Sequence, residues 1–311
     1  MKILRPISII LIIIILACLP MVIEKDSTIN LLILIFLYVI LATSWNILGG
    51  YTGQTSLGHA AFFGLGALAT RLLWIKGLHI LPSILAGGLL AVVFALLIGA
   101  PAFRLKGVYF AIGTLALAEI LNVTVGNLYP VIAGLPVEEL VAYQLTPRYY
   151  AFLGLVVIVV GCAYLLANSR LGLGMMAVRE EEDAAESLGV SALKHKLLAL
   201  GVSAFFTGLA GGGFAYYHVS YYFQFPFTPA WSLDMLTMVY IGGTGTILGP
   251  VIGAVFFVAL RQYLALNLGE YHLIVFGVLF IMVVLFLPGG IISVWSKLQT
   301  ALSRRLKSNA L

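Results

Sequence analysis

The chain is a series of long apolar segments separated by short polar connections. The apolar runs occupy residues 6–23, 29–48, 60–75, 81–100, 108–125, 150–167, 197–218, 232–241, 251–266 and 272–287. Most of them approach the length of about 17–25 residues that a helix needs to cross the hydrocarbon core of a bilayer. The pattern therefore predicts an all-α polytopic membrane protein with about eight to ten transmembrane or re-entrant helices.

Two glycine-rich stretches, residues 49–66 and 242–250, interrupt this apolar pattern. Irregular backbone at membrane depth is tolerated where it is buried in protein or lines a cavity. Glycine-interrupted segments in the two halves of a chain point to a transport path, whereas the alternative is close helix packing through small residues. The residues expected to line such a path are Gln54, Ser56, Gly58, His59, Gly243 and Gly245.

The longest polar interval covers residues 170–196 and includes five of the twelve acidic residues. Its middle predicts a short amphipathic helix with the acidic run 180–183 in the first turn, where the helix dipole favours negative charge. Gly189 would end this helix. The expected apolar patch consists of Ala184, Ala185 and Leu188. Such a helix is either a docking surface for a soluble partner or a solvated loop.

Composition and charge support the membrane assignment. The 311 residues are 62% hydrophobic and 9% charged, whereas about a quarter of the residues of a soluble domain are charged. With ten crossings and both termini on one side, twelve of the seventeen Lys and Arg residues fall on that side together with the interval 170–196. The positive-inside rule then places both termini and this interval in the cytoplasm.

Motifs for chemistry are missing from the sequence. It holds no phosphate-binding loop, so the chain is not expected to bind ATP itself, and it shows no catalytic or metal-ligand spacing. Glu119 lies inside an apolar run. A carboxylate at the bilayer centre costs about 2.5–3.5 kcal/mol, so Glu119 is expected to face the protein interior or be protonated, with a role in a substrate path preferred. Asp234 is expected near the outer end of its run, within reach of water.

Four separated segments carry a family resemblance. Asp183-Ala184-Ala185-x-x-x-Gly189 resembles the Glu-Ala-Ala-x-x-x-Gly loop of bacterial ABC importer permeases, with Asp in place of Glu. The segment from Ser56 through Gly58 and His59 resembles the Ser-x-Gly-His-x-x-Phe signature of LivM-type permeases of branched-chain amino acid importers. Segments 101–120 and 232–254 also resemble this family, and the likeness extends over about residues 29–290.

The resemblance implies a fold and a set of partners. The fold would be that of an ABC importer permease, with an N-terminal transmembrane helix in residues 1–28, a transmembrane domain in 29–290 and a basic cytoplasmic tail in 291–311. The loop 168–196 would seat its coupling helix on an ATPase subunit. The residues expected to couple are Arg179, Glu182, Asp183, Ala184, Ala185, Leu188 and Gly189.

The implied function is import of branched-chain amino acids across the inner (plasma) membrane of a bacterial or archaeal cell. Partners would be a second, homologous permease, two ATPase subunits that bind the ATP, and an extracytoplasmic solute-binding protein. Relatives often have Leu-Thr-Gly-Gly where this chain has Val-Ile-Ala-Gly-Leu-Pro at 131–136, so urea or a short amide is the alternative cargo. An intramembrane enzyme using Glu119, Asp234 and a histidine, or a passive channel, are the alternatives from other classes.

Overall fold

The computed structural model describes residues 4–22, 25–135, 137–286 and 289–293. The described elements are α1 (Leu4–Val22), α2 (Asp26–Thr52), α3 (His59–Ile75), α4 (Ile80–Ala102), α5 (Val108–Leu128), β1 (Ile132–Gly134), α6 (Val137–Val141), α7 (Leu145–Ala167), α8 (Arg170–Glu180), α9 (Glu182–Ser187), α10 (Ala192–Tyr217), β2 (Ser220–Tyr222), η1 (Phe225–Phe227), α11 (Ala230–Gly242), α12 (Gly249–Leu268), η2 (Gly269–Tyr271) and α13 (His272–Phe286). Most of the basic tail expected at 291–311 lies outside the described residues.

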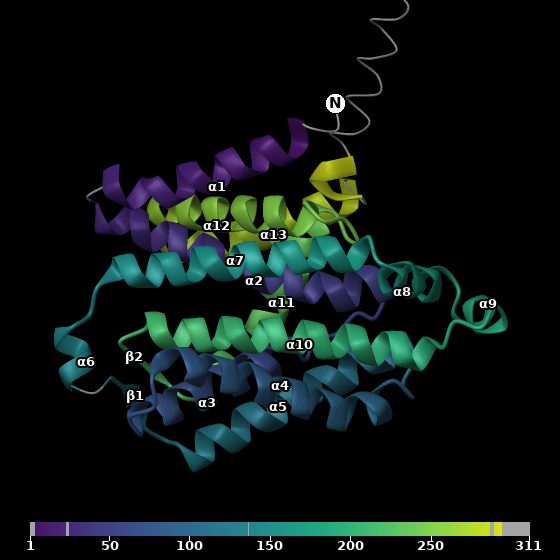
Figure 1. Ribbon diagram of the computed structural model, residues 1–311, viewed down its shortest axis with the longest axis horizontal. Coiled ribbons are helices and arrows are strands. Elements are labelled where there is room, and N and C mark those ends of the chain that lie inside the picture. Colours follow the sequence, from purple (N-terminus) through teal and green to yellow (C-terminus); the bar gives the residue numbers. More distant parts are fainter. Residues whose placement is uncertain (1–3, 23–24, 136, 287–288, 294–311) are drawn as a thin grey trace, which may run out of the picture.

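The long helices lie side by side in one bundle (Figure 1). Helices α8 and α9 project from one end, here called the α9 end, while α6 and the two-stranded β1–β2 sheet lie at the other, called the sheet end. Six helices of the described chain are long and apolar enough to cross a membrane, namely α2, α4, α5, α7, α10 and α12. The all-α architecture expected from the apolar runs is confirmed.

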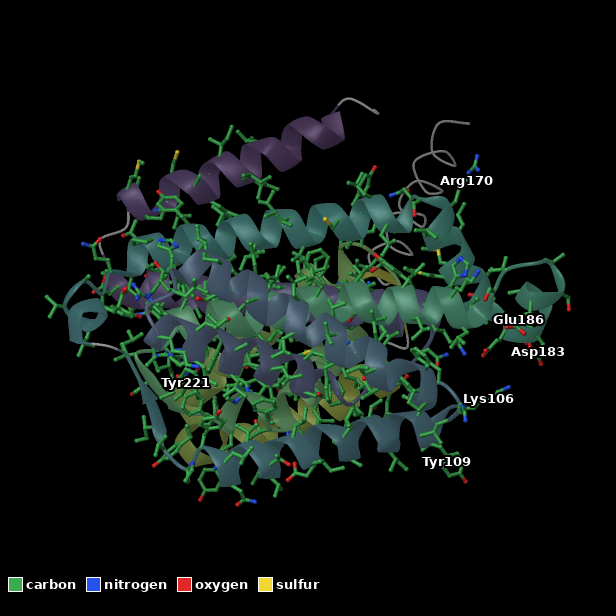
Figure 2. All side chains as sticks on the ribbon, turned by 60° about the horizontal axis from the view of Figure 1, so that its bottom comes forward. Lys106, Tyr109, Arg170, Asp183, Glu186 and Tyr221 are labelled. Atoms are coloured by element: carbon green, nitrogen blue, oxygen red, sulfur yellow. The ribbon has the colours of Figure 1, made fainter. Side chains whose placement is uncertain are left out.

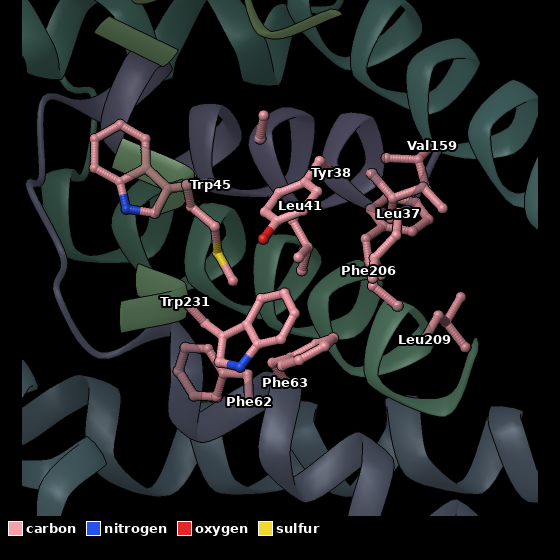
Figure 3. Packing of buried hydrophobic residues seen from close by; sticks show 14 of the residues in the cluster. Leu37, Tyr38, Leu41, Trp45, Phe62, Phe63, Val159, Phe206, Leu209 and Trp231 are labelled. Atoms are coloured by element: carbon pink, nitrogen blue, oxygen red, sulfur yellow. The ribbon is translucent and has the colours of Figure 1, made fainter. Parts of the chain in front are cut away.

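Helices α2 and α10 form the centre of the bundle. Most of their residues are buried, whereas α4, α5, α7 and α12 bury about a third or less of theirs. Figure 3 shows the aromatic part of the core, where the rings of Phe63 and Trp231 are 4.7 Å apart. Helix α10 meets α3 through glycines: a Cβ on Gly211 would overlap the carbonyl of Phe63, and one on Gly66 that of Gly208. The small residues therefore let the two backbones touch.

Two helices of the bundle begin at its middle depth instead of at an end. His59, the first residue of α3, contacts Ser203, which lies about 16 Å along α10 at 1.5 Å per residue. Ser232, near the start of α11, contacts the backbone of Ala60. From there α3 runs to the sheet end and α11 to the α9 end. Each is preceded by a full-length helix and a connecting segment, which are α2 and residues 53–58 for α3, and α10 and residues 218–229 for α11. The unit α2–α3 and the unit α10–α11 therefore have the same plan in opposite directions.

Two arginines hold the carboxyl end of α10 at the sheet end. Arg71 from α3 donates to the carbonyls of Ala215 and His218 at 2.8 and 2.6 Å. Arg148 from α7 donates to the carbonyl of Tyr216 at 2.9 Å. Both side chains are almost fully buried. Because the last carbonyls of a helix have no partner within it and carry partial negative charge, the guanidinium groups both satisfy and stabilise this end.

Helix α1 is attached to the rest of the bundle through α7. Pro20 lies inside α1 and has no N–H, so the carbonyl of Leu16 loses its normal partner four residues on. Tyr149 of α7 replaces it, donating its hydroxyl to the Leu16 carbonyl at 2.7 Å, and Tyr150 donates to Ala17 at 3.0 Å. The carbonyl left free by Pro20 and its hydrogen bond to Tyr149 thus determine where α1 packs on α7.

We expect Tyr149→Phe to loosen α1, because the Leu16 carbonyl would be left unpaired at a cost of about 1–3 kcal/mol. The measurement is hydrogen exchange of residues 11–22, which should become at least several-fold faster. Tyr164→Phe is the matched control, since Tyr164 lies exposed on the same helix. Unchanged exchange in Tyr149→Phe would show that the hydrogen bond from Tyr149 to Leu16 is not needed to dock α1.

Candidate functional site

A chain of hydrogen bonds lies at the depth where α3 begins. The backbone N–H of Gly58 donates to the Ser56 hydroxyl at 3.2 Å, and this hydroxyl lies 3.1 Å from His59 Nδ1. His59 Nε2 lies 2.8 Å from the hydroxyl of Ser203, which donates to the carbonyl of Ser44 at 2.6 Å. Because the Ser203 hydroxyl donates its hydrogen to Ser44, it accepts from His59, and the imidazole proton is therefore on Nε2. All five residues are buried, so the network is closed to lipid.

The same region supplies acceptors for N–H groups at the start of α3 and just before it. Ser232 accepts from the N–H of Ala60 at 2.8 Å, and Thr114 of α5 accepts from that of Leu57 at 3.1 Å. The indole of Trp45 donates to the carbonyl of Ser56 at 2.8 Å. Side chains from α2, α5 and α11 therefore hold the irregular backbone before α3 in one conformation.

A second cluster joins the two glycine-rich stretches at the α9 end. Asn46 accepts from the N–H of Gly245 and donates to the carbonyl of Thr246, both at 2.9 Å. Arg179 of α8 donates to the carbonyl of Gly50 at 2.7 Å. Gly245 has a positive φ of 74°, and a Cβ there would overlap the Arg179 guanidinium. Arg179 thus lies between α2 and the turn that connects α11 to α12.

Helix α9 is clasped to α8 and α10. Glu181 adopts an extended conformation that ends α8 and begins α9. The buried Lys196 of α10 forms an ion pair with Glu182 at 2.5 Å. Ala185 is 3% exposed and packs with Val178 and Ala192. These contacts tie α9 to the helix that carries Arg179.

The apolar patch expected on α9 is divided between its two sides. Ala184 and Asp183 are exposed and Leu188 is 86% exposed, but Ala185 faces the chain's own interior. The expectation of a single outward patch is therefore wrong for Ala185. Gly189 follows the helix with a φ of 86°, as a C-terminal stop requires. Figure 2 shows Asp183 and Glu186 at the projecting end of the molecule.

The two glycine-rich stretches have different structures. Residues 53–58 return from the α9 end to the middle of the bundle, whereas 243–248 form a turn at the α9 end between the packed helices α11 and α12. The expectation that they are equivalent parts of two halves is not met. The counterpart of 53–58 in the opposite unit is 218–229, which contains β2 and η1. Gln54, Gly243 and Gly245 lie at the α9 end, away from His59.

Two acidic residues differ from their expected positions. Glu119 is exposed on α5 and does not face the interior of the described chain. Asp234 is mostly buried, and it pairs with Arg261 of α12 at 3.0 Å and accepts from the Tyr38 hydroxyl at 3.2 Å. Its partners come from α2 and α12, far away in sequence. The sequence analysis missed this cluster, as it missed Asn46, Lys196 and Ser203, since only the folded chain brings these residues to their partners.

Comparison with known proteins agrees with this architecture. Residues 27–284 match the family model described as branched-chain amino acid transport system / permease component. The high-affinity branched-chain amino acid transport system permease protein LivM of Escherichia coli is 28% identical over 299 residues, covering 86% of this chain and 70% of that protein. The probable LivM of Methanocaldococcus jannaschii is 24% identical over 319 residues, covering 82% and 90% respectively. The search of solved structures found no match.

The long apolar helices, and the buried hydrogen bonds that connect them, define a multi-pass membrane protein of the permease class. The chain belongs to the family of permease components of branched-chain amino acid transport systems. The resemblance to LivM-type permeases seen in the sequence is confirmed.

The close contacts at Gly58 and Gly245 predict that even alanine is damaging there. A Cβ on Gly58 would lie 2.6 Å from the Thr114 carbonyl oxygen, and one on Gly245 would require a strained positive φ. We expect Gly58→Ala and Gly245→Ala to lower the midpoint of thermal unfolding in detergent. Gly161→Ala is the matched control, because its Cβ would meet open space. Equal midpoints for all three variants would contradict the packing described here.

Proposed function

We propose that this chain is the membrane permease subunit of an ABC importer for branched-chain amino acids. A second, similar permease would pair with it, two ATPase subunits would dock at the α9 end, and an extracytoplasmic binding protein would deliver cargo at the sheet end. The observation that carries the proposal is the set of contacts at the α9 end. There α9 follows α8 directly, and Arg179 of α8 contacts both glycine-rich stretches, at Gly50 and Gly245. An ATPase that moves α9 would therefore move the end of α2.

The charge distribution supports a cytoplasmic α9 end. This end holds Arg104 and Lys106 between α4 and α5, Arg170 and Arg179 in α8, and Lys194 and Lys196 in the first turns of α10. The sheet end holds Lys25, Arg71, Lys76 and Arg148, and two of these, Arg71 and Arg148, are buried on helix carbonyls. Since positive residues in short connections stay on the cytoplasmic side, the proposed orientation follows.

The proposed transport path runs beside the non-helical segment before α3. Gly58 and His59 lie where two helix amino-terminal ends meet at middle depth, and discontinuous helices of this kind form substrate sites in other transporters. In the described chain His59 is buried by Trp45 and Phe62, so we assign it to shaping the path and not to contacting cargo.

The cargo is proposed from the relatives, which are named for branched-chain amino acids. ATP-driven uptake of leucine, isoleucine and valine by the reconstituted system tests it. Uptake of urea or short amides in preference to these would replace the cargo assignment. Uptake that continues without ATP would indicate a passive channel.

Docking of the ATPase is tested with Leu188→Arg. Leu188 is the most exposed large apolar residue of the segment, and an unpaired charge buried in a partner's cleft is costly. We expect co-purification of the ATPase subunits and ATP-driven uptake to fall at least tenfold. Leu105→Arg is the control, because Leu105 is an exposed leucine in another connection at the same end. Normal assembly of Leu188→Arg would remove α9 as the docking element.

Transmission is separated from docking with Arg179→Ala. The variant loses the bond to Gly50 but leaves the exposed side of α9 unchanged. We expect the ATPase subunits to co-purify normally while uptake falls at least several-fold. Arg170→Ala is the control, since Arg170 is an exposed arginine of the same helix. Wild-type uptake by Arg179→Ala would show that movement of α9 reaches the bundle by another contact.

A further inference from the structure

Helix α5 lies at the edge of the bundle with one side buried and one side exposed (Figure 1). Phe110, Thr114, Ala118 and Val125 form its buried side. Glu119 lies on the opposite side with Ile112 and Val123, which are more than half exposed. It is about 16 Å from the start of the helix and about 14 Å from its end at 1.5 Å per residue. A carboxylate is therefore displayed outward at the centre of the membrane-spanning length.

The neighbouring helix α4 shows what a lipid-facing side looks like in this chain. Its exposed large side chains within the span are all aliphatic, and include Leu85, Leu89, Val93 and Leu97. An ionisable group facing lipid is strongly disfavoured, so such residues face a partner or a water-filled path. Most exposed large side chains of α5 are aliphatic as well, such as Ile120 and Val123, so the difference from α4 is the carboxylate at position 119. The side of α5 that carries Glu119 is therefore not expected to face lipid.

Glu119 has no cation to neutralise it among the described residues. Its hydrogen-bond partner is Asn122 of the same helix, whose amide donates to the carboxylate at 3.3 and 3.4 Å. The other charged groups along the described spans are engaged: Arg71 and Arg148 bind carbonyls, and Asp234 pairs with Arg261. Glu119 thus differs from these groups, because within the described residues its carboxylate has a hydrogen-bond partner only on its own helix.

The polar character continues from Glu119 towards the sheet end. Asn122 and Gly126 follow at three and seven residues and so lie on the same side of the helix. The side-chain amide of Gln224 lies against Gly126, where a Cβ would overlap its oxygen. Towards the α9 end the same side holds Leu115 and Ile112. A polar stripe of one carboxylate and two amides therefore extends from the sheet end to middle depth and stops there.

We propose that this stripe lines the outer half of the transport path and that Glu119 binds the primary ammonium group of the transported amino acid. The inference rests on the proposed function and adds the cargo group that is recognised. A carboxylate accepts hydrogen bonds from an ammonium group and supplies its counter-charge. Leu115 and Ile112, on the α9 side of Glu119, would contact the apolar side chain of the same amino acid.

Water access is measured first, in the full transporter in proteoliposomes with Cys18 and Cys162, both free and exposed, replaced by Ser. Glu119→Cys should react with a membrane-impermeant, cationic thiol reagent at least tenfold faster than Val93→Cys, at similar depth on α4. Asn122→Cys should react as well. Equally slow reaction at positions 119 and 93 overturns the aqueous stripe, because it would mean that lipid or a tightly packed partner covers α5.

Recognition of ammonium is measured by uptake. Glu119→Gln keeps the size and removes the charge, and we expect it to raise KM for leucine at least tenfold, with Glu119→Asp intermediate. Glu139→Gln at the sheet end is the control and should keep the wild-type KM. Co-purification of the ATPase subunits with Glu119→Gln shows that assembly is intact. A wild-type KM in Glu119→Gln overturns the ammonium site. If the wild-type transporter itself shows no ATP-driven uptake of amino acids, the proposed function is overturned instead.

Discussion

The structure depends on satisfying backbone polar groups at the middle of a membrane-spanning bundle. Helix α3 starts there, so its first N–H groups are without helical partners, in a place where water is scarce. Ser232 accepts from the N–H of Ala60 in the first turn, and Thr114 and Ser56 accept from the N–H groups of Leu57 and Gly58 just before the helix. Because Thr114 belongs to α5 and Ser232 to α11, both of these helices stabilise the start of α3. The polar centre thus specifies the packing of the apolar helices around it.

The two ends of the bundle are held together by different contacts. At the sheet end Arg71 and Arg148 fasten α3 and α7 to the carboxyl end of α10 through buried hydrogen bonds. At the α9 end, α8 is bonded to α2 by one hydrogen bond from Arg179 to Gly50, and α9 to α10 by one ion pair between Lys196 and Glu182. The two hydrogen bonds of Asn46 and the packing of Ala185 lie at the same end.

Glycine has two separate uses in this chain. Between α3 and α10 its lack of a side chain allows backbone contact over several turns, as at Gly66 and Gly211. At Gly245 the requirement is conformational, because a positive φ lets the turn direct its N–H at Asn46. Both uses are invisible to a hydropathy profile, which records only that the apolar runs are interrupted.

The sequence by itself determined the class of protein, the positions of the long helices and the presence of a short helix that ends before Gly189, because length, apolarity and helix-end residues are local properties. It did not predict α8, which includes Glu180, so that α9 begins at Glu182 and not at 180. The motifs around His59 and Asp183 likewise indicated the family. Only the tertiary structure decided that Ala185 turns inward, that Asp234 pairs with Arg261 across 27 residues, and that Glu119 faces outward. The side of a helix that is covered depends on its neighbours. In a chain that is apolar almost all round, the sequence of one helix carries too little contrast to say which side that is.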